Sequence, residues 1–506
     1  MIRPSVRTTI GVLALCAASH APARAQLPTA AATPGHDAPV ITRVDIAAAW
    51  RNVELATAGR VLAGDSLALL NGRVDDATIA LRTGRTGNGL RALHEAAADF
   101  GNAPAMRATA RQLAALRVTL TPRLLVRGRT DIDPRVTIAP LYALGGQAGD
   151  SLRGTVRFTR GTQLVTEVPF AVATDRAESQ TVPVGGEGLR RGDGGRIAVA
   201  TAALPHPLPR ADDGRWFTTT RNPDDVRIDL LRKADAFDTL LTPEMHAAGA
   251  TFRARVRSLN AEVVASNRTP FADSPVTLSR DLQAEYDLLI AGGNPYANRY
   301  GDHWRVVRLP NAVVPVRLYV PLDVARTRRP APLVVVLHDE GGDENTFPDQ
   351  FSRIVGLAES ARVVVASVNS DVFSGSGDDF NGIVAAIHAD VTIDVERIYV
   401  IGHGRGGEQA AALAVSRPTL IAGVACIAGF NRIPAGMIVA PILVILGERD
   451  PISPPERLSP IAADAVAGGA SVDVGIVPNQ GHTLIVNAAL PSAIEWLLRH
   501  TRLRPK

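Results

Sequence analysis

The sequence predicts an α/β domain at the C-terminus, with a mostly parallel sheet and helices on both faces, preceded by helical and small all-β regions. From about residue 301, continuous apolar runs such as Leu333 to Leu337 alternate with helical patterns, as expected for a parallel sheet buried on both faces. Before that, apolar residues recur every three to four positions up to residue 116, and every second position from about 117 to 204. With 46% hydrophobic and 21% charged residues among 506, the composition is globular and can fill several cores.

Residues 1–25 have the pattern of a secretory signal peptide. Arg3 and Arg7 give a positive start, residues 10–18 form an apolar run, and residues 23–25 (Ala-Arg-Ala) form a small-x-small cleavage site. The apolar run is too short to span a bilayer. We therefore expect an exported protein, periplasmic or extracellular, that starts at Gln26 after cleavage. The alternatives are a buried N-terminal helix, and a lipoprotein signal.

Cleavage would change both the charge and the cysteine content. Three arginines and no acidic residue would leave, which lowers the formal net charge from +4 to +1. A nearly neutral chain has no electrostatic reason to bind nucleic acid. Cys16, the candidate lipidated residue of the lipoprotein alternative, follows Leu15, where such signals have a small residue. Its removal would leave Cys426 without an intrachain partner. Cys426 lies in an apolar run, so we expect a buried apolar side chain and not a nucleophile.

Four regions lie between the signal and the C-terminal domain. Residues 26–40 contain three prolines and a glycine and are predicted to be a flexible leader. Residues 41–116 are predicted to be helical, and residues 117–204 to form a small β-sandwich-like domain. Residues 205–300 form a helical or linker region, whose helices we expect to pack with those of 41–116. The all-β region contains no cluster of titratable residues, so a binding or spacer role is the default interpretation.

The domain at 301–506 is predicted element by element. An antiparallel hairpin comes first, with strands at 304–309 and 313–320. Strands at 333–337, 363–368, 398–401, 421–427, 442–446 and 472–477 then alternate with helices at 347–360, 378–388, 406–415, 456–467 and 488–500. Right-handed crossovers place the loops that follow parallel strands at one edge of the sheet, where sites of this architecture lie.

Four segments at these strand ends resemble known catalytic loops. Residues 337–342 (LHDEGG) resemble the oxyanion loop of secreted esterases, in which a backbone N–H faces the developing oxyanion. Residues 401–407 (IGHGRGG) resemble the Gly-x-Ser-x-Gly nucleophile elbow between a strand and a helix. Residues 446–451 (LGERDP) resemble the turn that carries the catalytic acid, and residues 480–483 (QGHT) the histidine loop. The order of nucleophile, acid and base is the one this fold uses.

Together these segments resemble the α/β-hydrolase family, over about residues 300–506. The stretch from Asp379 to Gly407 is most similar to polyhydroxybutyrate-depolymerase-like and feruloyl-esterase-like enzymes. The resemblance implies an ester-like ligand, small or polymeric, and no cofactor or metal. It implies Asp450 as the acid, His482 as the base, and the backbone N–H groups near Glu340 and at Arg405 as oxyanion donors. It leaves residues 26–300 unexplained, and the sequence indicates no oligomeric state.

The chain departs from the family pattern at the nucleophile, because Gly404 stands where the elbow has serine. Hydrolysis in this fold passes through an acyl-enzyme, and glycine has no hydroxyl to form it. Loss of a triad member typically leaves ~10³–10⁴-fold catalysis over water. Glycine also relieves the backbone strain of the elbow. We therefore expect an intact fold with missing or impaired serine-esterase chemistry, and the sequence leaves enzymatic activity open.

Other residues near the strand ends are candidate replacements. The alternative nucleophiles are Ser367, Ser374, Ser376, Ser453 and His403. The serines fit ordinary loop positions, and a histidine before the elbow residue usually packs beside it. Asp450 and His482 could each be structural, although their joint placement favours remnant catalytic positions. His338 has no partner at metal-ligand spacing, which argues against a zinc site.

Only about 14 residues separate the strands that end at Ile427 and begin at Ile442, where lids of this fold are usually inserted. This short connection predicts an uncapped, open groove suited to bulky or polymeric ligands.

Three functions fit the sequence. The first is a hydrolase-fold protein with little or no activity that binds a ligand or partner. The second is a working ester hydrolase, in which His482 and Asp450 activate water directly or a different serine is used. The third is a protein whose function lies in the N-terminal modules, with the hydrolase-like domain as a structural end-piece.

Overall fold

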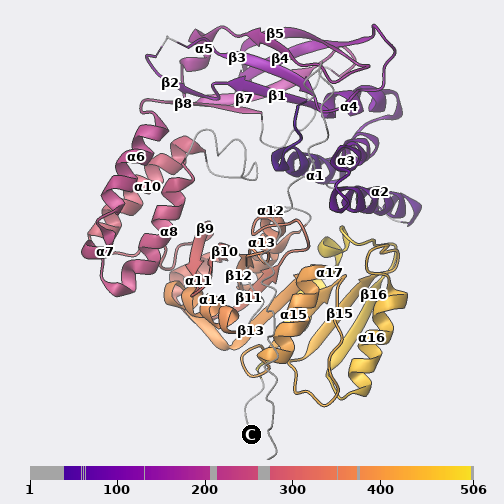
Figure 1. Ribbon diagram of the computed structural model, residues 1–506, viewed down its shortest axis with the longest axis vertical. Helices are drawn as coiled ribbons and strands as arrows, with labels where there is room; N and C mark the ends of the chain where they lie inside the picture. Colours follow the sequence, from indigo (N-terminus) through magenta and orange to yellow (C-terminus); the bar gives the residue numbers. More distant parts are fainter. Residues whose placement is uncertain are drawn as a thin grey trace, which may run out of the picture. The chain divides into compact units, whose positions relative to one another are not determined.

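The computed structural model describes residues 39–502, except 59, 61, 63, 130–131, 205–213, 260–273, 350–351 and 373–376. The predicted signal peptide, the leader up to residue 38, and the candidate nucleophiles Ser374 and Ser376 lie outside the described residues. None of the helices in the described part is both long and apolar enough to cross a membrane. Figure 1 shows the order of the elements along the chain.

The first helices form a small layer with a core of its own. They are α1 (Arg43–Thr57), α2 (Gly64–Arg82), α3 (Thr86–Gly101), the short 3₁₀ helix η1 (Pro104–Met106) and α4 (Arg107–Ala114). Thr42 caps α1 in a capping box with Asp45, which satisfies amides at the start of the helix. Both α1 and α2 pack on α3, and Val53, Val74 and Leu93 are among the residues they bury together.

Two β-sheets follow and share one core. The strands are β1 (Leu116–Thr121), β2 (Leu124–Val126), β3 (Arg135–Pro140), β4 (Ser151–Arg160), β5 (Gln163–Ala173), β6 (Gln180–Pro183), β7 (Gly194–Ala200) and β8 (Arg215–Thr219), with the short helix α5 (Gly186–Arg190) before β7. Their orders are β1-β3-β6 and β2-β8-β7-β4-β5. Strand β8 lies beyond residue 204, the predicted end of the all-β region. It pairs with β7, and its Trp216 lies in the shared core.

A second group of helices has a separate core. It comprises α6 (Pro223–Ala234), α7 (Phe237–Leu240), the 3₁₀ helix η2 (Pro243–Met245), α8 (His246–Arg257) and α10 (Pro275–Ile290). Leu230, Phe252 and Leu282 lie together in this core, which shares no residue with the core of α1–α3. The expectation that the two helical groups pack together is wrong, because α8 instead packs against the first strand of the C-terminal sheet.

The C-terminal domain is built on an eight-stranded sheet. Its strands are β9 (Gly301–Arg308), β10 (Val313–Val320), β11 (Ala331–Leu337), β12 (Val364–Val368), β13 (Ile393–His403), β14 (Gly423–Ile427), β15 (Ile442–Gly447) and β16 (Val472–Val477). They lie in the order β16-β15-β14-β13-β11-β12-β10-β9. Strand β10 is antiparallel to both neighbours, and the other pairs are parallel. This confirms the predicted fold class, an α/β-hydrolase fold.

Helices cover both faces of this sheet. The helices are α11 (Leu322–Thr327), α12 (Thr346–Asp349), α13 (Ile354–Ala361), α14 (Gly377–Asp390), α15 (Arg405–Ser416), α16 (Pro455–Ala467) and α17 (Ile485–Leu497). Successive side chains of a strand point to opposite faces. Leu333 and Val335 of β11 therefore pack in the core with α14, α15 and α16, whereas Val334 and Val336 pack in the core with α13 and α17. The loops after β11, β13, β15 and β16 leave the same edge of the sheet.

Candidate active site

The elbow between β13 and α15 has the sharp turn that the motif predicts. His403 ends the strand, Arg405 begins the helix, and Gly404 lies between them with φ +53° and ψ −119°. Side chains of L-residues rarely adopt this conformation. Glycine is also required beside it, because a Cβ at Gly402 or Gly406 would lie under 3.0 Å from neighbouring backbone atoms. The flanking glycines therefore allow the turn that presents residue 404, and residue 404 itself carries no side chain.

The structure brings the predicted acid and base together. Asp450 Oδ2 lies 2.9 Å from His482 Nδ1, and both residues are buried. The other oxygen of Asp450 accepts hydrogen bonds from the amides of Ile452 (2.8 Å) and Ser453 (2.7 Å), which hold the carboxylate in place. The two residues therefore have the geometry expected of the acid and base of a hydrolase triad.

A second carboxylate occupies the space beside Gly404, where the family pattern places a serine side chain. Asp339, in the loop after β11, accepts a hydrogen bond at Oδ1 from the amide of Arg405 (2.9 Å). Its Oδ2 lies 3.0 Å from Nε2 of His482. A Cβ at Gly404 would lie under 3.0 Å from three atoms of this carboxylate, closer than real Cβ atoms approach. The Asp339 side chain therefore fills the space that a serine at this position would need, and it makes the hydrogen bond to histidine that a serine would make.

Sequence reasoning missed Asp339. Acidic residues are common in loops, and nothing local indicates that this side chain turns inward. The one available signal is the lack of a side chain at Gly404, which leaves room for a neighbour.

The two predicted oxyanion donors have different surroundings. The Arg405 amide is used by Asp339. Glu340 is exposed, in a turn closed by the hydrogen bond from the Gly342 amide to the Asp339 carbonyl (3.0 Å). Its amide makes no hydrogen bond with any described residue. One of the two donors is thus already occupied by the chain itself.

A cation from the N-terminal region completes the cluster. Arg82, at the end of α2, forms an ion pair with Asp339 through Nη2, and the same nitrogen lies 3.2 Å from His482 Nε2. No sequence pattern indicates this contact, because Arg82 and His482 are 400 positions apart.

Helix α2 covers the histidine loop, so the prediction of an open groove is wrong. Residues 428–441, all described, contain no helix between β14 and β15, so the predicted absence of a lid at that point holds. The cover comes instead from α2, where Asp75 accepts hydrogen bonds from the amides of His482 (2.9 Å) and Thr483 (3.0 Å).

The two carboxylates control the protonation of His482. Burial disfavours its charged form, but hydrogen bonds to Asp339 and Asp450, and their charges, outweigh burial and raise the pKa of His482 to about 9. Burial also opposes ionisation of Asp339, whereas the hydrogen bond from His482 and the nearby positive groups lower its pKa well below the usual range. At neutral pH the centre is therefore an imidazolium between two carboxylates.

His403 and His338 have structural partners. The buried His403 donates from Nε2 to the His482 carbonyl (2.9 Å), and burial lowers its pKa to about 4, so it is neutral. His338 accepts at Nε2 from the Ser370 amide (2.9 Å) and donates from Nδ1 to the Asp339 carbonyl (2.7 Å). With both nitrogens used by backbone groups, His338 offers no lone pair to zinc.

A group with metal-like spacing does exist in the site. Asp339, His403 and His482 each offer one ligand atom, and these atoms lie within 4.8 Å of one another. The guanidinium of Arg82 already binds Asp339 there, and Nε2 of His403 is used in the bond to the histidine loop. Two groups of the chain, the Arg82 guanidinium and the His482 imidazolium, therefore already place positive charge beside this carboxylate.

Among the described residues, no serine hydroxyl contacts the His482 ring. The ring bonds Asp450 and Asp339, and the Arg82 guanidinium lies beside it. Ser367 is fully buried in β12 with an unbonded hydroxyl, and Ser453 lies in the acid turn. Cys426 is buried in β14, where burial raises the pKa of its thiol far above the usual value.

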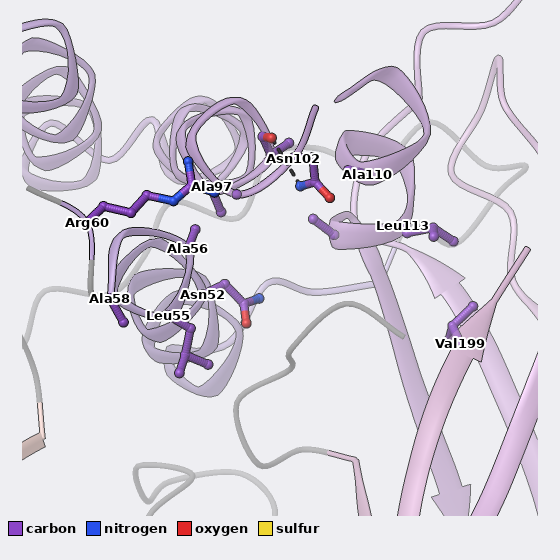
Figure 2. A pocket seen from close by; sticks show the side chains of 13 residues that line it. Asn52, Leu55, Ala56, Ala58, Arg60, Ala97, Asn102, Ala110, Leu113 and Val199 are labelled. Carbon is purple, nitrogen blue, oxygen red and sulfur yellow. Dashed lines mark hydrogen bonds between the residues drawn. The ribbon is translucent and has the colours of Figure 1, made fainter. Parts of the chain in front are cut away.

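A cavity of about 230 Å³ lies away from these loops, among α1, α3, α4 and β7 (Figure 2). Its polar lining residues are Asn52, Arg60 and Asn102, and the others are apolar or glycine, mostly alanine. No acid, histidine, serine or cysteine lines it, so it offers no second set of catalytic groups.

Comparison with known proteins gives a curated relative that matches part of the chain, whereas no family model matches it. The chain is 30% identical over 157 residues, 27% of its length, to "Putative esterase NocK" of Nocardia uniformis subsp. tsuyamanensis. The match covers 45% of NocK, so the chain spans less than half the length of this relative.

Solved structures that resemble the chain include hydrolases. They include S-formylglutathione hydrolase from Staphylococcus aureus (TM-score 0.33, 15% identity, 39% of this chain and 98% of that one). Dienelactone hydrolase from Anabaena variabilis (TM-score 0.32, 16% identity, 40% and 98%) is another. A third is the esterase Est2 of Thermogutta terrifontis (TM-score 0.33, 15% identity, 39% and 92%).

Proposed function

We propose that this chain is an exported hydrolase-fold protein that has lost serine-esterase chemistry and acts by binding a ligand or partner. The observation that carries the proposal is the position of Asp339, whose carboxylate fills the space of the nucleophile beside Gly404 and bonds both the elbow amide and His482. The ester-like ligand class rests on the name of the curated relative.

Three requirements of acyl transfer fail together in this arrangement. Gly404 supplies no nucleophile. His482 cannot accept a proton at neutral pH because it already carries one, with a pKa of about 9. The Arg405 amide, which would stabilise the oxyanion, is occupied by Asp339. Losing one requirement alone would reduce the rate, and losing all three leaves no route through an acyl-enzyme.

The test compares the hydrolysis of short-chain p-nitrophenyl esters by the wild type and by designed variants. Gly404→Ser alone is a poor test, because the serine would overlap Asp339. The double variant Gly404→Ser/Asp339→Ala supplies a hydroxyl, the space for it and a free elbow amide. We expect no enzymatic hydrolysis by the wild type. The double variant should show measurable hydrolysis, and a fluorophosphonate should label its introduced hydroxyl at the elbow.

The matched control is Gly404→Ala/Asp339→Ala, which has nearly the same shape but no hydroxyl, and should stay inactive. Wild-type turnover comparable to that of ordinary esterases would refute the proposal. If neither double variant hydrolyses esters, the acid–base pair itself is not competent, and the loss of chemistry extends beyond the nucleophile.

A second candidate is direct activation of water by His482, which the intact Asp450–His482 hydrogen bond of 2.9 Å favours. This activity needs neutral imidazole, so its rate would rise as the pH passes about 9. It would vanish in His482→Ala and give no fluorophosphonate label. Labelling of a different serine would instead support a relocated nucleophile.

A further inference from the structure

Helix α2 carries two different stripes of side chains. Leu70, Val74 and Ala77 face the apolar core that α2 shares with α1 and α3. Each of these residues is followed in sequence by a polar one: Asn71, Asp75 and Thr78. With Arg82, the polar residues are spaced by four, three and four positions, which places them on one face of the helix. An exposed polar face would be ordinary, but here Asn71 is 1% exposed and Asp75 2%.

Buried polar side chains are unfavourable unless they are hydrogen-bonded, and this stripe is bonded to the histidine loop. Asn71 accepts from the Gly481 amide (2.9 Å) and donates to the Asn479 carbonyl (3.2 Å). Asp75 accepts from the next two amides, those of His482 and Thr483. Three consecutive amides of the loop therefore donate to α2, and Thr78 reaches the Thr483 hydroxyl (2.8 Å).

The loop is also shaped for this helix. A Cβ at Gly481 would lie under 3.0 Å from the Asp75 carboxylate, so glycine is needed for the close approach. The fourth member of the stripe, Arg82, enters the catalytic centre itself and pairs with Asp339. Asp339 can take that position only because Gly404 has no side chain. The docking of α2 and the absence of a nucleophile therefore depend on each other.

We propose that the vacated catalytic centre is the docking socket for α2 of the same chain, so that the partner bound by this site is the protein's own N-terminal helical layer. The inference rests on the proposed function, because a centre that turned over esters would have to admit substrate where Arg82 and Asp339 lie. The Arg82–Asp339 pair closes the socket, and the amides of residues 481–483 form its floor.

The test measures hydrogen exchange in the full-length chain. Arg82→Gln removes the cation but leaves Asn71, Asp75 and Thr78 unchanged. If α2 is held as a unit, the amides of 481–483 should exchange at least about tenfold faster, because a hydrogen bond to a charged group typically contributes more than one tenfold step in an equilibrium constant. The matched control is Arg85→Gln. Arg85 is exposed, lies just beyond the end of α2, and donates a hydrogen bond to the Thr83 hydroxyl. It should leave these amides unchanged.

A second variant reaches the socket from its other side. Gly404→Ser changes no residue of α2, yet it should displace Asp339 and speed exchange at the same three amides. Gly436→Ser places the same side chain at another positive-φ glycine (φ +76°) with open space around it, and serves as its control. Unchanged exchange at 481–483 in both Arg82→Gln and Gly404→Ser would overturn the proposal.

A double-mutant cycle keeps the test decisive if one variant folds poorly. In Arg82→Gln/Asp339→Asn, the exchange rates of the 481–483 amides should be no higher than in the faster-exchanging single variant. Additive effects of the two substitutions on these rates would count against the socket. The ester assay separates the two proposals. Ordinary esterase turnover by the wild type would overturn the proposed function, whereas unchanged exchange in a protein without turnover would overturn the socket alone.

Discussion

Asp339 and Gly404 form a complementary pair, in which the carboxylate of one fills the space left by the side chain that the other lacks. Asp339 gains an amide, an imidazolium and a guanidinium as partners, which together offset the loss of water around a buried carboxylate. This arrangement predicts that a change at one of the two residues alters the effect of a change at the other.

Gly404→Ser should therefore destabilise the wild type by more than backbone strain alone. The overlap with Asp339 should add about 1–3 kcal/mol, as overpacking of a filled site typically does. In an Asp339→Gly background the same serine has room, so its cost should fall to the strain term. Urea unfolding of the two single variants and the double variant measures the coupling, with Gly436→Ser as the strain control. Equal costs of the serine in both backgrounds would show that the carboxylate does not occupy this space.

His482 should make stability depend on alkaline pH. Its pKa rises from 6.5 in the unfolded chain to about 9 in the folded protein. The stabilisation is therefore fully present below pH 6.5 and is lost as the pH rises through about 9, by on the order of 3 kcal/mol. Unfolding free energies measured between about pH 6 and pH 10 should fall in the wild type and stay flatter in His482→Gln. His246→Gln, which changes an exposed histidine, should retain the wild-type slope; a flat wild-type profile would contradict the charged state of the centre.

For single residues, the sequence could predict which site residues directly follow a strand. It could not predict that a loop side chain turns inward. Gly404, Asp450 and His482 can be identified because each follows a predicted strand of the sheet, and the structure places Asp450 against His482. Asp339 cannot be identified in this way because its position depends on a void, and a void is a property of packing in three dimensions.

Among the helices and strands, those whose apolar residues follow one clear spacing along the chain can be predicted from the sequence. The central strands β11, β12 and β14 are nearly continuous apolar runs because both of their faces are buried. Helix α2 lies in the predicted helical region, but its polar stripe has the pattern of a solvent-exposed face. Only the partner loop, about 400 positions away, shows that the stripe is buried, and no local pattern carries that information.

Strand β8 shows a different limit of prediction from the sequence. The alternating pattern is interrupted before it, so the predicted all-β region ends at residue 204 and β8 falls in the predicted helical or linker region. Residues 205–213, outside the described part, separate β8 from the strands before it, and the helical pattern resumes soon after. The packing of Trp216 places β8 in the β-sandwich. Its side chain is buried, and the centroid of its ring lies 5.7 Å from that of Phe158. Its Nε1 donates a hydrogen bond to the Leu189 carbonyl (3.1 Å).

Trp216→Ala should therefore lower the free energy of unfolding by about 3–5 kcal/mol, the usual cost of truncating a buried aromatic side chain. Phe217→Ala changes the next residue, which is half-buried on the opposite face, and should cost clearly less. Thermal and urea unfolding of the two variants provide the comparison. Similar losses for both would mean that β8 contributes to the sandwich as a surface strand and not through its core.

For the whole molecule, the regions before residue 301 have a definite relation to the hydrolase-like domain through α2. Sequence patterns alone assign no role to the N-terminal helices, yet one of them supplies the side chains that cover the histidine loop. These contacts favour an interpretation in which α2 and the loops of the C-terminal domain form one site over one in which that domain is only a structural end-piece.

Export is the remaining property of the whole chain, and it is predicted from residues 1–25. Signal peptidases accept small side chains at the two anchoring positions of the cleavage site, so Ala23 and Ala25 should direct cleavage before Gln26. Intact-mass measurement of the protein recovered from the periplasm or the medium should show a chain that starts at Gln26. Ala25→Leu should leave the precursor uncleaved, because leucine is too large for that position. Ala17→Leu, within the apolar run, should be processed normally. Recovery of a soluble cytoplasmic protein that keeps Met1 would rule out export, and the proposal of an exported binding protein would then have to be abandoned.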